Sequence, residues 1–141
     1  DQAETVFDLT LKALQVLDSQ AEVPAVFPLL FRARLACAYG YAPDLTRCAV
    51  CGCSFPQGTE VLFSWQSGQA VCPECRKSLD DYRSLPGQDV AKVQALLQQD
   101  PVQWLQAGWP DQGARRLWPM LDSFVQRHTG LVWHEGRFRR V

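Results

Sequence analysis

Apolar side chains recur at helical spacing in four stretches of the chain, and each stretch predicts a helix. The first covers residues 3–19. Its apolar positions are Val6, Leu9, Ala13 and Leu17, with Phe7, Leu11 and Leu14 beside them. The other stretches cover residues of about 25–39, 88–99 and 113–129. Residues 102–112 are ambiguous, so the pattern as a whole predicts a mainly α fold.

The pattern changes between the second and third predicted helices. Residues 61–65 and 69–71 form short apolar runs next to turn signals, which predicts the two strands of a β-hairpin. Residues 84–88 are expected to form a break, and residues 131–141 a tail after the last helix. The prediction is a helical bundle in two parts, residues 1–47 and 77–141, with a small module of residues 48–76 inserted between them.

Composition supports a folded domain whose charge is unevenly distributed. The chain has 141 residues, 47% of them hydrophobic, and a net charge of −1, which argues against a protein that coats nucleic acid over its whole surface. Residues 101–141 nevertheless carry six arginines and three acids. No secretory signal and no apolar run of about 20 residues is found, so we expect a cytoplasmic protein with no membrane contact and reduced thiols.

Four cysteines have the spacing of a structural zinc site. Cys48 and Cys51 form one C-x2-C pair, and Cys72 and Cys75 form another after a gap of twenty residues. Each pair on a tight turn directs two sulfurs at one ion, and two facing turns close a tetrahedron with no open position for chemistry. With the hairpin between the pairs, this predicts a zinc ribbon that holds one structural Zn²⁺. We prefer a zinc site to free thiols or disulfides. We also prefer it to a redox pair, because a redox motif would need only one C-x2-C.

Two further cysteines need another account. Cys53 could replace Cys51 as a ligand only by widening the first turn to C-x4-C. Gly52 after Cys51 suits a zinc knuckle, because glycine readily takes positive φ. We therefore expect Cys51 to be the ligand and Cys53 a bystander. Cys37 lies in an apolar helical run and is expected to be a small buried side chain.

The sequence contains no catalytic constellation. A phosphate-binding glycine-rich loop, a Gly-x-Ser-x-Gly elbow and a cluster of carboxylates with histidine are all missing from it. His128 and His134 are expected to be ordinary histidines, since four thiols already satisfy one metal. We therefore expect a protein that is not an enzyme and has no small-molecule substrate.

The residues around the first cysteine pair resemble a known family. The stretch from Phe31 to Gly52 ends in Gly-Tyr-x-Pro-x-Leu-x-x-Cys-x-x-Cys-Gly, and Val71-Cys-Pro-Glu-Cys75 continues the match. This resembles the C-terminal half of RecO, a bacterial DNA repair family. The resemblance implies a recombination mediator that binds single- and double-stranded DNA and anneals complementary strands. It also implies partnership with RecR and SSB, loading of RecA, and association with the nucleoid during repair.

The N-terminal domain of a RecO protein is usually an OB-fold, a barrel that binds nucleic acid. No such all-β stretch precedes the first predicted helix, so we expect this chain to lack that domain. The alternative function is a zinc-stapled protein-interaction module that makes no DNA contact of its own.

Candidate DNA contacts are cations near the cysteines and in the tail. They are Arg47, Arg76 and Lys77 beside the cysteine pairs, and Arg137, Arg139 and Arg140 near the end of the chain. Trp65 on the predicted hairpin is either a stacking platform for bases or, as we prefer, a core residue. Five further arginines are expected on solvated helix faces: Arg32, Arg34, Arg115, Arg116 and Arg127.

Overall fold

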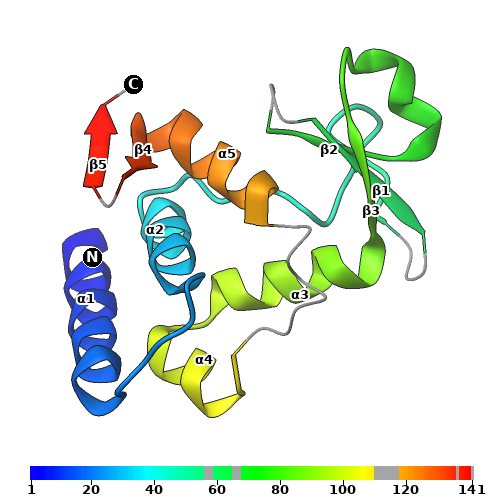
Figure 1. The fold of residues 1–141 in the computed structure, drawn as a ribbon. Coiled ribbons are helices and arrows are strands. Elements are labelled where there is room, and N and C mark those ends of the chain that lie inside the picture. The colour runs from blue at the N-terminus through cyan, green and yellow to red at the C-terminus, as the bar shows by residue number, and fades with distance from the viewer. Residues whose placement is uncertain (56–58, 65–67, 110–117, 136, 141) are drawn as a thin grey trace.

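A computed structural model gives the fold and describes every residue except 56–58, 65–67, 110–117, 136 and 141. The elements in chain order are α1 (Gln2–Ser19), α2 (Phe27–Ala38), β1 (Glu60–Phe63), β2 (Ala70–Val71), the 3₁₀ helix η1 (Pro73–Ser78), β3 (Arg83–Pro86), α3 (Gly87–Gln98), α4 (Pro101–Gln106), α5 (Trp118–Thr129), β4 (Leu131–His134) and β5 (Arg137–Arg140) (Figure 1). The fold is mainly helical with a small antiparallel sheet and a separate hairpin, which confirms the predicted fold class.

The helices pack around α2. This helix contacts α1, α3 and α5, while α4 packs against α1. Side chains from each of the helices α1 to α5 join one buried cluster. Trp104 of α4 is fully buried there, its Nε1 donates to the Leu96 carbonyl at 2.9 Å, and its ring meets Phe27 of α2 edge-on. These helices therefore share one hydrophobic core. The three-stranded sheet lies on the side of the molecule away from α1 (Figure 1).

Most predicted helices are confirmed. The stretches 3–19, 25–39 and 88–99 correspond to α1, α2 and α3, and α5 is the described part of the stretch 113–129. The ambiguous stretch contains α4, which begins with a capping box. The Asp100 carboxylate accepts from the Gln103 N–H, and the Gln103 side chain accepts from the Asp100 N–H, both at 2.9 Å. No helix among those described is both long and apolar enough to cross a lipid bilayer.

Only part of the apolar surface of α1 is buried. The buried positions are Leu9, Ala13 and Val16, whereas four other apolar residues are exposed. They are Phe7 at 70%, Leu11 at 44%, Leu14 at 58% and Leu17 at 46%. The reason is that α1 has apolar residues on most of its circumference, and α2 and α4 cover only one side of it.

The residues expected to form a break instead supply a third strand. β3 pairs with β1 in antiparallel register, with Val61 opposite Leu85, and the sheet order is β2-β1-β3. β3 is an edge strand, where Pro86 is tolerated because no further ladder needs its missing N–H. The predicted strands at 61–65 and 69–71 correspond to β1 and β2. The expected tail is also structured, since β4 and β5 form a hairpin.

The three-stranded sheet is covered on both faces. Val61, Phe63, Ala70 and Leu85 belong to the main core cluster with the helices. Leu62 and Val71 alternate with them and belong to a second cluster with Cys48 and Cys72. One face of the sheet therefore supports the helical bundle, and the other supports the cysteines.

Candidate metal centre

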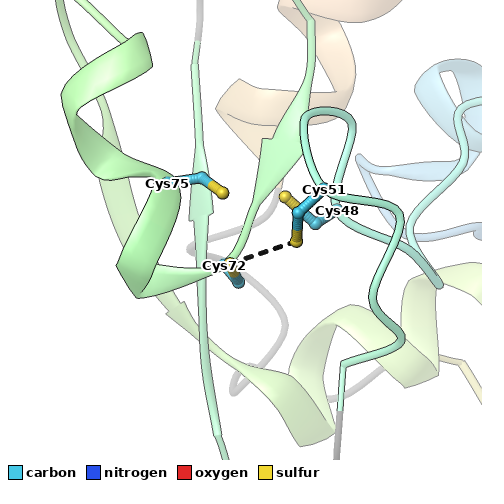
Figure 2. A group of neighbouring side chains, drawn as sticks. All are labelled: Cys48, Cys51, Cys72 and Cys75. Carbon is cyan, nitrogen blue, oxygen red and sulfur yellow. Dashed lines mark hydrogen bonds between the residues drawn. The ribbon is translucent and has the colours of Figure 1, made fainter.

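Four cysteines from two segments meet beside the sheet. Cys48 and Cys51 lie on the loop between α2 and β1, Cys72 directly follows β2, and Cys75 lies in η1 (Figure 2). Their four Sγ atoms all lie within 4.8 Å of one another. The two C-x2-C pairs, twenty residues apart in the sequence, therefore face each other in space.

The first knuckle is held by its own backbone. The Gly52 N–H donates to the Cys48 carbonyl at 3.0 Å, and the Cys48 N–H donates to the Cys53 carbonyl at 2.8 Å. Gly52 has a φ of +74°, a conformation that favours glycine. The Val50 N–H donates to the Cys48 Sγ at 3.4 Å, so the turn also presents a donor to a thiolate.

The second cysteine pair is tied to the same framework. The Ala49 N–H donates to the Ala70 carbonyl at 2.9 Å, which fixes the first knuckle to strand β2. The Cys75 N–H donates to the Cys72 carbonyl at 3.0 Å, closing the second turn. Ser78 Oγ caps that turn by donating to the Cys75 carbonyl at 2.6 Å. Both turns are thus positioned by strand β2 and the short helix η1.

The cluster is buried on one side and open on the other. Cys48 and Cys72 are 3% and 8% exposed and pack against Leu62 and Val71. Cys75 is half-buried, whereas Cys51 is exposed. Leu62 and Val71 were not among the site residues predicted from the sequence, although an unbroken apolar run is typical of a strand covered on both faces.

The protein raises the pKa of some of these thiols and lowers that of others. Burial opposes ionisation of Cys48, but backbone N–H groups of Cys51, Cys72 and Val50 favour its thiolate and bring its pKa down to about 6. The pKa of Cys51 is also lowered, first by the Cys53 N–H. A hydrogen bond with the Cys72 thiol raises the pKa of Cys75 to about 12. A bound cation would replace the remaining protons.

The donor set fits a metal ion. In a tetrahedron with metal–sulfur bonds of about 2.3 Å, neighbouring sulfurs lie about 3.8 Å apart. The Sγ atoms of Cys51 and Cys72 are 3.8 Å apart (Figure 2). The four sulfurs, all within 4.8 Å of one another, are enough donors for a tetrahedral shell. Cys48, Cys51, Cys72 and Cys75 could therefore bind one metal ion.

The other cysteines and the histidines stand outside this group. Cys53 is exposed, and its Sγ lies 3.2 Å from that of Cys51. Cys37 lies in α2, partly buried against the main core, and burial raises the pKa of its thiol. His128 stacks on Tyr41 with ring centroids 5.0 Å apart, and His134 lies in β4 beside Glu135.

The candidate DNA contacts fall in two separate regions. Arg47, Arg76 and Lys77 are exposed, and each lies within two residues of a cysteine in the cluster. The exposed residues Arg137, Arg139 and Arg140 all lie on β5, at the opposite side of the molecule from the three-stranded sheet (Figure 1). Arg139 approaches Glu135 at 3.6 Å. Trp65, Arg115 and Arg116 lie outside the described residues.

Together, the fold and the site define a class of protein: a helical domain that carries a ribbon with four clustered cysteines. The family model described as "Recombination protein O C terminal" matches residues 1–137. The chain therefore belongs to the RecO family of DNA repair proteins, and the resemblance seen around the first cysteine pair is confirmed.

Individual relatives agree with this assignment. The chain is 32% identical over 139 residues to the DNA repair protein RecO of Oleidesulfovibrio alaskensis, an alignment that covers 99% of this chain and 56% of that protein. It is 33% identical over 145 residues to the DNA repair protein RecO of Nitratidesulfovibrio vulgaris, covering 100% of this chain and 57% of that protein. The chain thus spans a little more than half the length of these relatives.

Proposed function

We propose that the four-cysteine cluster binds one Zn²⁺ and that this zinc is structural. Four thiolates favour zinc or an iron–sulfur cluster, and the two-turn ribbon with a closed shell is typical of structural zinc. Cys48, Cys51, Cys72 and Cys75 would be the ligands. Such a zinc would supply folding free energy on the order of 10 kcal/mol and no open coordination position for catalysis.

Elemental analysis of the purified chain tests the metal. We expect one zinc per chain and a colourless protein. An iron–sulfur cluster would instead bring iron, sulfide and a visible absorption spectrum, and would overturn the assignment to zinc. A chain without any bound metal, after expression in zinc-supplemented medium, would overturn the metal site itself.

We further propose that the protein acts in recombinational DNA repair as a mediator rather than as an enzyme. It would bind single- and double-stranded DNA in the bacterial cytoplasm and anneal complementary strands. With RecR it would help to load RecA onto single-stranded DNA coated by SSB. The observation that carries this proposal is the match of residues 1–137 to the C-terminal part of the RecO family.

A test with the longer protein addresses the mediator role. We expect RecR to be captured by the protein and complementary SSB-coated strands to anneal faster in its presence. A control with heat-denatured protein separates specific annealing from charge neutralisation. Failure to capture RecR and failure to accelerate annealing would together overturn the proposal.

The candidate DNA-binding cations lie in two separate regions, which favours a second candidate function, a docking module without DNA contact. Arg76 and Lys77 belong to η1, beside the three-stranded sheet, whereas the other candidate arginines belong to β5 at the opposite side of the molecule (Figure 1). In this alternative, the ribbon is a zinc-stapled docking module and touches no DNA. The two candidates differ in whether this chain, by itself, binds single strands.

Fluorescence anisotropy with a labelled single strand across a salt series distinguishes the candidates. If DNA contacts the ribbon, Lys77→Ala should make the slope of log K against log salt shallower by about 0.7, the share of one phosphate contact. Arg140→Ala tests the hairpin in the same way. Lys92→Ala is the matched control, because Lys92 is an exposed cation on α3. No binding at low salt would favour the docking module.

A further inference from the structure

Cys53 lies beside one corner of the metal centre. Its Sγ is 3.2 Å from the Sγ of Cys51, which is closer than the 3.8 Å between Cys51 and Cys72. Two sulfurs bound to one zinc lie about 3.8 Å apart. In this arrangement Cys51 and Cys53 are closer together than two ligands of one tetrahedron, so both sulfurs lie at the same corner.

This corner is the exposed one. Cys48 and Cys72 are buried against the sheet, and Cys75 is half-buried in η1. Cys51 and Cys53 are both exposed. One thiol can therefore replace the other at this position without opening the packing between the sheet and the buried cysteines.

The backbone holds Cys53 close to the first cysteine pair. The Cys53 carbonyl accepts from the Cys48 N–H at 2.8 Å, and the neighbouring Arg47 and Ser54 form a bridge between the two arms of the loop. Gly52 joins Cys51 to Cys53, and a Cβ built on it would meet no atom within 4 Å. Gly52 therefore lies in open space, and glycine has the widest choice of backbone angles of any residue.

We propose that Cys53 is a fifth thiolate donor of the metal centre and takes the corner of Cys51 when Cys51 leaves it. The inference rests on the proposed metal site. In the exchange, Cys53 Sγ would replace Cys51 Sγ as a ligand of the ion. The thiol proton of Cys53 would pass to Cys51, so no electrons would be transferred and the charge of the centre would be unchanged. The site should thus tolerate the loss of Cys51 but not the loss of Cys48, Cys72 or Cys75.

Cobalt substitution of the whole chain tests the exchange. Co²⁺ is added to the metal-free protein as the probe, and the thiolate-to-cobalt charge-transfer absorbance per bound ion reports how many thiolates coordinate it. We expect equal absorbance from the wild type, Cys51→Ser and Cys53→Ser, since each retains four donors. The double variant C51S/C53S should lose about a quarter of the absorbance or all binding.

The matched control is Cys75→Ser, since the structure places no spare thiol beside Cys75 that is comparable to Cys53. Cys75→Ser should behave like the double variant. If Cys51→Ser lost as much absorbance as Cys75→Ser, the exchange would be overturned while the metal site stood. If the wild type itself did not bind Co²⁺ through four thiolates, the metal site would fail instead.

A measurement on the unmodified chain avoids any effect of substitution on folding. The zinc-loaded protein is treated briefly with iodoacetamide, and the labelled positions are mapped by mass spectrometry. Exchange predicts that molecules carry one label at either Cys51 or Cys53, with both sites represented. Label at Cys53 with none at Cys51 would overturn the proposal.

Discussion

At the scale of single residues, Asp100 connects two helices through one carboxylate. One oxygen accepts from the Gln103 N–H at 2.9 Å and caps α4, and the other lies 3.0 Å from Lys12 Nζ on α1. Asp100→Ala removes both interactions and should lower the free energy of unfolding by about 1–2 kcal/mol, mainly through the lost cap. Asp100→Asn keeps a capping oxygen and should cost less. Urea denaturation at pH 7 measures both.

The Asp100 effect should depend on pH with a defined sign. Burial raises the pKa of Asp100, but the Gln103 N–H and Lys12 outweigh it and hold the pKa below the ordinary 3.8. The carboxylate therefore stabilises the fold above the unfolded-state value, and this stabilisation disappears as pH falls through the lowered pKa. The difference between wild type and Asp100→Ala should shrink below about pH 4. A difference unchanged down to about pH 2 would contradict this assignment.

Asp8 provides the control for this prediction. It lies 2.8 Å from the same Lys12 Nζ, but its side chain is 55% exposed and caps no helix. An exposed ion pair contributes little, so Asp8→Asn should change the free energy of unfolding by about 0.5 kcal/mol or less. A loss as large as that of Asp100→Ala would show that the ion pairs, rather than the cap, carry the effect.

The cysteines illustrate what residue spacing could predict. Two C-x2-C pairs are local patterns, and the geometry of each turn depends on residues within a few positions, such as Gly52 with its φ of +74°. The four sulfurs could therefore be expected to meet. The contact between Cys51 and Cys53 could not be predicted in this way, because spacing alone does not give the direction of two side chains that are two residues apart.

At the scale of elements, α1 offers a test of which helix face belongs to the core. Leu9 is 3% exposed and Phe7 is 70% exposed, although both lie in the same apolar pattern. Leu9→Ala should lower the free energy of unfolding by about 2–5 kcal/mol because it leaves a cavity. Phe7→Ala should change it by about 0.5 kcal/mol or less. Thermal or urea denaturation of the two variants measures the contrast, and equal losses would place both residues in the core.

Pairing partners explain the elements that the sequence did not predict. β3 exists because β1 offers it a free edge, and the partner of Pro86 is Glu60, which is far away in the sequence. Locally, residues 84–88 carry only the signals of a break. The α4 helix was ambiguous for a similar reason, since its stability comes from the capping box at Asp100 and the burial of Trp104 rather than from a repeating pattern.

At the scale of the whole molecule, the sheet joins the four-cysteine cluster to the helical bundle. Leu62 and Val71 face the cysteines, while Val61, Phe63 and Ala70 on the same strands face the helices. α3 contacts both β1 and β3 and also packs on α2. The sequence predicted an inserted module and a bundle as separate parts, and periodicity gave no indication that they share one sheet.

This shared sheet predicts that removing the metal will destabilise the helices as well as the ribbon. If the metal contributes several kcal/mol, a chelator should lower the helical melting temperature by roughly 10 °C or more, because each kcal/mol corresponds to about 2–4 °C in a chain near this size. Circular dichroism at the helical bands, before and after chelation, measures the shift. Replacing the chelated metal should restore the original transition.

The control distinguishes coupling from general damage. Cys37→Ser, in a helix and apart from the cysteine cluster, should retain the full response to the chelator, whereas Cys72→Ser should melt at the lowered temperature with or without it. Val61→Ala on the bundle-facing side of β1 should lower the melting temperature and reduce the additional effect of the chelator, because the two perturbations act through one sheet. If the chelator left the helical melting temperature unchanged in every variant, the ribbon would fold independently of the bundle, and the two faces of the sheet would not be coupled.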